Sequence, residues 1–274
     1  AWAFATAGER APELFDTIAR AVAPRLGEFK AQGLANVAWA FATAGERAPG
    51  LFGAIARTAE QRVDEFSSQG LANIAWAFAT MGVRAPALFG AIACAAERRV
   101  AEFNAQDVAT TVWAFATAGE RAPRLFVVLA RSAEPRVDDF SPQGLASTSW
   151  AFATAGERAP GLFGAIARVA ERQVDEFSSQ GLANMAWSFA TAGERAPGLL
   201  NAIARTAEQR MDEFSSQGLA NTAWAFATAG ERAPGLFGAI ARTAEQRVDE
   251  FNPQEVANTA WAFATAGERA PGLF

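Results

Sequence analysis

The chain has 274 residues, of which 51% are hydrophobic and 19% are charged, and its formal net charge is −5. It contains no His, no Tyr and a single Cys, Cys94, which excludes His-based acid–base catalysis, Cys–His pairs, a disulfide framework and the usual His or Cys metal sites. The apolar content is too high for a disordered chain, and no stretch reaches the roughly 20 apolar residues of a membrane-spanning helix.

A repeat with a fixed period of 37 residues runs through the whole sequence. The tryptophans show it most clearly: they are Trp2, Trp39, Trp76, Trp113, Trp150, Trp187, Trp224 and Trp261. A fixed period of this size is typical of stacked supersecondary units. We therefore predict an all-α fold, an α-solenoid of about seven two-helix repeats that wind into a right-handed superhelix.

The repeats are expected to form a single array over residues 1–274. Because Ala1 is not an initiator Met and both ends fall inside a repeat, we expect a fragment of a longer protein. Complete repeats are predicted at 30–66, 67–103, 104–140, 141–177, 178–214 and 215–251, with partial repeats at 1–29 and 252–274.

The first helix of each repeat, helix A, is expected to begin at a residue such as Ser67 and to end before a glycine such as Gly82. Ser-Pro at 141–142 and Asn-Pro at 252–253 combine an N-cap with a proline at the first helical position. Glu255 adds a capping box to the last of these helices. The closing glycines suit the left-handed residue that follows a helix.

The second helix, helix B, is expected to run from Pro49 or its equivalent to about Phe66. Pro24 and Pro135 fall inside it in two repeats and should kink it or end it early. One face is apolar, and the others carry most of the charged residues of the repeat. Helix B is therefore predicted to form the outer, solvated layer, with Arg62 and its equivalents lying over the edge of the core. The apolar face consists of Leu51, Phe52, Ile55, Ala59, Val63 and Phe66.

Helix A carries an uncharged polar stripe with the pattern Gln-x3-Asn-x2-Trp-x3-Thr, which places the four residues on one side of the helix. Helical repeats can bind single-stranded RNA with such residues, because an amide offers a donor and an acceptor and Trp offers a stacking face. The RNA-binding candidates are Asn36, Asn73, Thr110, Ser147, Asn184, Asn221 and Asn258, with Trp39, Trp76, Trp113, Trp150, Trp187, Trp224 and Trp261.

Structural roles would explain the same stripe. The Asn side chains could bond to the next repeat and fix its register, and Trp could pack between adjacent helices A. Thr43 and its equivalents are expected to bond to a carbonyl of their own helix. The residues leave both interpretations of the stripe open.

An arginine recurs in the link between the two helices. In register, these arginines would line one rim of the array and contact phosphates. A glutamate such as Glu46 precedes nearly all of them, so a solvated link or an ion pair between repeats is the alternative. The phosphate-contact candidates are Arg47, Arg84, Arg121, Arg158, Arg195 and Arg232.

The phrase Gln-Gly-Leu-Ala-Asn-x-Ala-Trp-Ala-Phe-Ala-Thr-Ala-Gly resembles the helix A signature of the octotricopeptide and heptatricopeptide repeat proteins of algal and protist organelles. It is also similar to the leucine-rich repeat regions of FAST-kinase-like and RAP-domain proteins, and to a subunit of the mitochondrial RNA-editing substrate-binding complex. The resemblance covers the whole chain. It implies an α-solenoid in the mitochondrion or chloroplast that binds organellar RNA through the Asn36 series and its neighbours, and acts in RNA stability, processing, editing or translation.

We therefore predict an RNA-binding helical-repeat protein that is not an enzyme and whose partner is single-stranded RNA. The alternative is a protein–protein interaction scaffold that binds a peptide or partner helix in a concave groove. No cofactor, metal, small-molecule substrate or membrane partner is expected. The negative charge lies mostly on helix B, so it does not exclude RNA from helix A.

Overall fold

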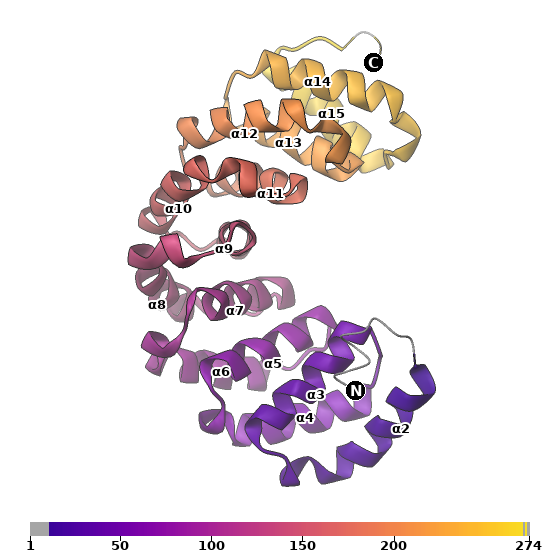
Figure 1. Cartoon of the computed structure of the whole chain (residues 1–274), viewed down its shortest axis with the longest axis vertical. Helices are drawn as coiled ribbons and strands as arrows, with labels where there is room; N and C mark the ends of the chain where they lie inside the picture. Colours follow the sequence, from indigo (N-terminus) through magenta and orange to yellow (C-terminus); the bar gives the residue numbers. More distant parts are fainter. Residues whose placement is uncertain (1–10, 271, 273–274) are drawn as a thin grey trace. The chain divides into compact units, whose positions relative to one another are not determined.

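The computed structural model describes residues 11–270 and 272, so Trp2, Pro271 and the first part of the expected partial repeat 1–29 lie outside the described residues. The chain divides into two compact units, residues 1–133 and 134–274. Within the described residues the secondary structure is all helical, as predicted, and includes no strand (Figure 1). None of the described helices is long and apolar enough to cross a membrane.

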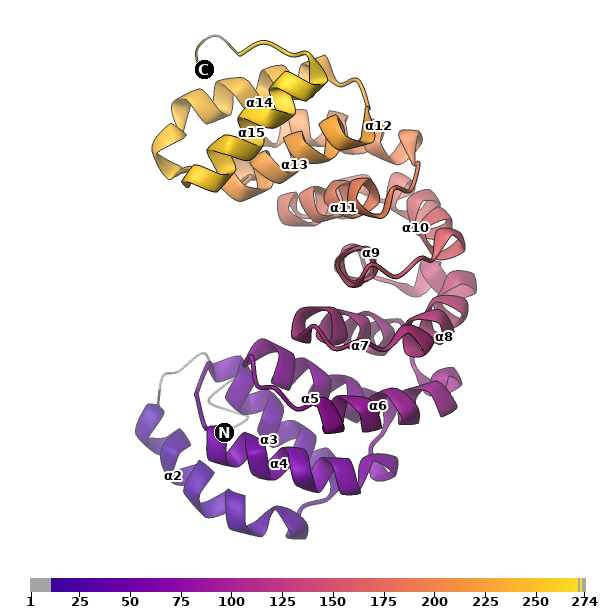
Figure 2. The ribbon, with the colours of Figure 1, turned by 180° about the vertical axis from the view of Figure 1, so that it is seen from behind.

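The first compact unit contains two layers of helices. In one layer α5 packs between α3 and α7, and in the other α2, α4, α6 and α8 pack in succession (Figure 2). The helices A are α3 (Ala31–Ala44), α5 (Ser68–Thr80) and α7 (Ala105–Ala118). The helices B are α2 (Pro12–Val22), α4 (Pro49–Gln61), α6 (Pro86–Arg98) and α8 (Pro123–Ala133), and the 3-10 turns are Ala23–Glu28, Val63–Glu65 and Val100–Glu102.

The second compact unit repeats this arrangement. Its helices A pack in the order α9, α11, α13 and α15, and its helices B in the order α10, α12 and α14. The helices A are α9 (Pro142–Ala155), α11 (Ser179–Ala192), α13 (Ser216–Ala229) and α15 (Pro253–Ala266). The helices B are α10 (Pro160–Arg172), α12 (Pro197–Gln209) and α14 (Pro234–Gln246), and the 3-10 turns are Glu134–Asp139, Val174–Glu176, Met211–Glu213 and Val248–Glu250.

Helix A begins and ends where its caps predict. The Ser141 hydroxyl accepts a hydrogen bond from the Gly144 N–H over 3.1 Å, and Asn252 and Glu255 form the expected capping box. Gly45 adopts a left-handed conformation with φ of 67°, and its N–H bonds to the carbonyl of Ala42. These contacts satisfy backbone groups that a helix end otherwise leaves unpaired.

Helix B ends earlier than Phe66. In α4 the α-helix stops at Gln61, because Arg62 leaves the helical region with φ of −121° and ψ of 24°, and a 3-10 turn follows. The two repeats with an internal proline have an even shorter helix B: α2 and α8 have 11 residues where α4 has 13. The early ends at Pro24 and Pro135 are thus confirmed, since proline cannot supply the N–H that continues the helix.

Within each compact unit the core lies between the two layers and joins one repeat to the next. A buried phenylalanine of helix B meets a buried phenylalanine of the following helix A edge to face, as in Phe52 and Phe78, whose ring centroids lie 5.1 Å apart. Aromatic pairs of this geometry contribute about 0.5–1.5 kcal/mol beyond the area that they bury. The equivalent pairs are Phe15–Phe41, Phe89–Phe115, Phe163–Phe189 and Phe237–Phe263.

Candidate functional site

The polar stripe is an accessible surface of helix A. Its glutamines, from Gln32 to Gln254, are all exposed, and the Asn36 series is half-buried or exposed. The residue that follows each of these asparagines is mostly buried instead; Met185, for example, accepts a hydrogen bond from Ser149 of the neighbouring helix A. Of the positions that the resemblance implied, the Asn36 series can meet a ligand, and most of its neighbours cannot.

Most amides of the stripe have no partner within the protein. No hydrogen bond joins the side chains of Asn36, Asn73, Asn184 or Asn221 to any described residue. Asn258 differs, because its carbonyl oxygen accepts a bond of 2.9 Å from Gln254. A ladder of Asn side chains that fixes the register of the repeats is therefore not what the described residues form.

The threonines that end the stripe also lack the expected contact. Thr43, Thr80 and Thr117 are exposed, and no described residue accepts a hydrogen bond from their hydroxyls. The expected bond to a carbonyl of their own helix is thus wrong for these three residues. Their hydroxyls extend the row of free polar groups toward the C-terminal end of helix A.

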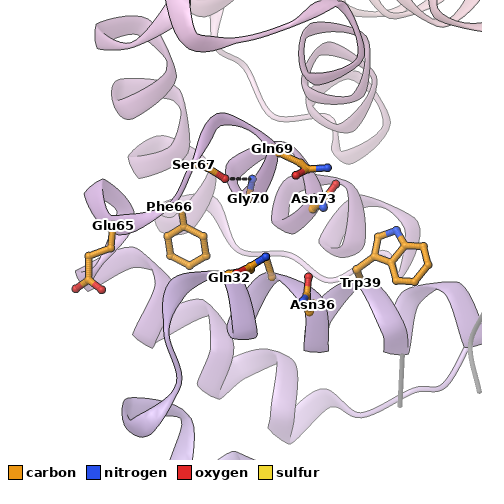
Figure 3. A pocket seen from close by; sticks show the side chains of 10 residues that line it. Gln32, Asn36, Trp39, Glu65, Phe66, Ser67, Gln69, Gly70 and Asn73 are labelled. Atoms are coloured by element: carbon orange, nitrogen blue, oxygen red, sulfur yellow. Dashed lines mark hydrogen bonds between the residues drawn. The ribbon is translucent and has the colours of Figure 1, made fainter. Parts of the chain in front are cut away.

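A cleft of about 590 Å³ lies between the stripes of α3 and α5. Figure 3 shows the amide groups of Gln32 and Asn36 on α3 and of Gln69 and Asn73 on α5 around the same space. Gly70 also lines it, and a Cβ atom on this glycine would lie 3.3 Å from the ring of the preceding phenylalanine. The cleft thus presents several free donors and acceptors and little charge.

Two pairs of neighbouring tryptophans on the stripe contact each other. Trp39 and Trp76 have ring centroids 6.4 Å apart with an interplanar angle of 32°, and Trp224 and Trp261 show 6.4 Å and 30°. Trp261 is 48% exposed, and the other stripe tryptophans are half-buried. Rings in contact are partners for each other, so a base would meet their exposed edges rather than the space between them. For these two pairs the geometry favours the packing role of Trp.

The arginines of the interhelix links are free cations. All six candidates are exposed, and none forms an ion pair or hydrogen bond with a described residue. Of the expected alternatives, an ion pair between repeats is not found for them, whereas their exposure is compatible with a solvated link. They are Arg47, Arg84, Arg121, Arg158, Arg195 and Arg232.

A second arginine series has a structural role that sequence analysis missed. The guanidinium of Arg62 makes two specific contacts: its Nη1 donates to the carbonyl of Phe29 in the preceding repeat over 2.9 Å, and its Nη2 pairs with Glu65 at 2.6 Å. This pairing raises the pKa of Arg62 and lowers that of Glu65, mainly through the hydrogen bond between the two side chains. We call this contact the arginine fork; it recurs at Arg99, Arg210 and Arg247. The recurring Arg-x-x-Glu spacing was the available signal.

The chemistry of this surface is that of binding. It combines free amides, aromatic edges and peripheral cations, which can hold a ligand through hydrogen bonds and charge. Among the described residues no group of three or more His, Cys, Asp or Glu could hold a metal ion.

Comparison with known families gives a match over nearly the whole chain. A family model described as RESC6, RNA-editing substrate-binding complex 6 protein, matches residues 1–270. No curated protein matches the chain. The family match covers the whole of the described helical array.

Proposed function

The chain belongs to the family of RNA-editing substrate-binding complex 6 proteins, and on this basis we propose that it binds single-stranded RNA along the polar stripes of its helices A. The unpaired amides of Asn36, Asn73, Asn184 and Asn221 carry this proposal. Asn is a poor helix former, and the accessible amides of these residues have no partner within the described part of the protein. A ligand that bonds to these amides would offset that cost.

Single-stranded RNA fits the three kinds of group on this surface. Base edges present donors and acceptors that match amides, and bases can contact the exposed edges of the tryptophan rings. The free arginines of the links are suited to phosphates, which position a strand without reading its sequence. Each kind of group on this surface thus has a matching group on RNA.

The charge distribution limits the strength of this binding. The net charge is −5, and the stripes carry no basic residue. Affinity would therefore depend on hydrogen bonds, stacking and a rim of single arginines. It would fall as salt rises, because salt weakens the contacts between these arginines and the RNA phosphates. We expect modest affinity with a shallow dependence on salt.

Removing stripe amides tests the proposal. Replacing Asn36, Asn73, Asn184 and Asn221 together with Ala should weaken binding of a fluorescently labelled single-stranded RNA by about tenfold or more, because each lost hydrogen bond contributes about 1 kcal/mol. Fluorescence anisotropy at low and high salt measures the effect.

The matched control removes amides from the other helix. Gln209→Ala and Gln246→Ala lie on exposed positions at the ends of α12 and α14 and should leave RNA binding unchanged. Equal losses in both variants, or no binding by the unmodified chain at low salt, would rule the proposal out.

A protein scaffold is the second candidate, favoured by the net charge of −5 and the lack of any cation on the stripes. The amides could equally bond to the backbone of an extended peptide. Competition separates the two functions: a peptide that binds the stripe and is not displaced by RNA would favour the scaffold.

A further inference from the structure

The third residue of helix A divides the repeats into two classes. It is a glycine in α3, α5, α9, α11 and α13, which we call the glycine helices. In α7 it is Asp107 and in α15 it is Glu255, and we call these two the acid-capped helices. This position matters for a ligand because Gly70 lines the cleft between α3 and α5.

Asp107 brings a carboxylate to the junction between α5 and α7. Its Oδ2 accepts a hydrogen bond from the Ser68 hydroxyl of α5 over 2.9 Å and one from the Asn104 N–H over 3.3 Å. The residue is only 3% exposed. In the preceding repeat the equivalent residue is Gly70, which has no side chain. Asp107 therefore adds a fixed negative charge at this position, and its carboxylate contacts the neighbouring helix.

Glu255 places a second carboxylate at the same position of α15. Its Oε2 accepts a hydrogen bond of 2.9 Å from the Asn252 N–H, which holds the carboxylate at the start of the helix. Both acids thus have a capping role that fixes where their charge lies.

The stripes of the acid-capped helices are also the ones whose amides are engaged. Gln106 donates to the Thr110 hydroxyl over 3.1 Å, and Gln254 donates to Asn258 over 2.9 Å. No such bond joins the Gln and Asn side chains in the glycine helices. Two independent features, a carboxylate at the third position and a satisfied amide on the stripe, therefore occur in the same two helices.

We propose that Asp107 and Glu255 exclude RNA from the stripes of α7 and α15. This inference rests on the proposed function, because the excluded ligand is the one that the glycine helices would bind. A fixed carboxylate repels a phosphate backbone, and an amide already bonded within the protein has one donor fewer for a base. Each acid-capped helix is the last helix A of its compact unit, so each unit binds RNA through its glycine helices alone: α3 and α5 in the first, α9, α11 and α13 in the second.

Neutral variants of the same shape test the exclusion. Asp107→Asn with Glu255→Gln keeps an acceptor for each capping bond and removes two charges. Affinity for a fluorescein-labelled single-stranded RNA of mixed sequence should rise about three- to tenfold at low salt, and this gain should shrink as salt screens the charges. Glu60→Gln with Glu171→Gln removes two exposed charges from helix B and should change affinity little.

The reverse change tests the same idea in a glycine helix. Gly181→Asp in α11 should weaken RNA binding several-fold more than Gly181→Asn, because the two side chains differ in charge and hardly in size. Comparison of the two variants removes the effect of filling the space beside Phe177, whose ring would lie 3.3 Å from the new Cβ atom. Circular dichroism confirms that both variants keep their helix content.

The outcomes separate this proposal from the proposed function. If the unmodified chain binds RNA but the neutral double variant binds like the helix B control, or if Gly181→Asp and Gly181→Asn bind equally, the exclusion is overturned and RNA binding stands. If the unmodified chain and all variants fail to bind RNA at low salt, the proposed function falls and the exclusion falls with it.

Discussion

Gln173 stands where four described repeats place the arginine of the fork. Its side-chain carbonyl oxygen is buried and has no hydrogen-bond partner. A buried polar atom without a partner loses the bonds that water gave it, at a cost of about 1–3 kcal/mol. A single residue thus both removes a contact between repeats and adds an unsatisfied atom.

Restoring the arginine should strengthen the contact between these two repeats. Gln173→Arg would place a guanidinium within reach of the Phe140 carbonyl and Glu176, the equivalents of the partners that Arg210 uses. The expected gain is about 1 kcal/mol in unfolding free energy, seen as a higher thermal midpoint by circular dichroism. Gln61→Arg adds the same side chain at an exposed position and should give no comparable gain; a rise of equal size there would contradict the fork as the cause.

Thr111 is a second residue with an unsatisfied buried atom, since its hydroxyl has no partner and the residue is fully buried. Val37 occupies the equivalent position in α3. Thr111→Val should therefore stabilise the chain by about 1 kcal/mol, measured by chemical or thermal unfolding. Thr222→Val is the control, because the Thr222 hydroxyl bonds to the Gly218 carbonyl over 2.8 Å; a gain in both variants would show that the missing bond is not the reason.

At the level of helices, the sequence was sufficient wherever a local signal governs the backbone. Ser141, the Asn252 capping box and the closing glycines predicted where helix A begins and ends, because each acts on groups within one turn of itself. The end of helix B was predicted too late. The backbone turns at Arg62 and equally at Gln173, which lacks the contact of the arginine fork. The fork is therefore not what ends the helix, and neither position carries the glycine or proline that would predict an end there.

In the candidate site, too, some features follow from a local pattern and others depend on how the repeats pack. Helical periodicity correctly placed the Asn and Gln residues on one accessible side of helix A. It could not show that Asn73 lacks a partner, that Trp39 and Trp76 contact each other, or that Arg47 is unpaired. These properties depend on the distance between neighbouring repeats, which only the packed structure defines.

Across the whole molecule, Arg–Glu pairs on the turns after helix B add up to a shared response to pH. Hydrogen bonds from arginine lower the pKa of the glutamate in five described pairs: Arg25–Glu28, Arg62–Glu65, Arg99–Glu102, Arg210–Glu213 and Arg247–Glu250. The glutamates are exposed, so each pair contributes little by itself. Because the same pair recurs along the chain, the small contributions to stability are lost over the same range of pH.

Acid should therefore destabilise the array. A carboxyl group with a lowered pKa in the folded state gives its full stabilisation above the unfolded pKa, about 4.3 for Glu, and loses it as pH falls through the folded value. The arginines stay charged throughout. Thermal midpoints should fall below about pH 4, and a variant with Glu65, Glu102, Glu213 and Glu250 replaced by Gln should show a smaller fall; identical pH profiles would contradict this assignment.

The arginine fork also bears on how such a chain can change length. The four forks use the same atoms, with Nη1 to carbonyl distances from 2.7 to 2.9 Å. A gene that gained or lost one whole 37-residue segment would therefore still encode repeats that can form this contact with each other. Duplication alone would then lengthen the row of helix A stripes in fixed steps, without any new side chain having to evolve where two repeats meet.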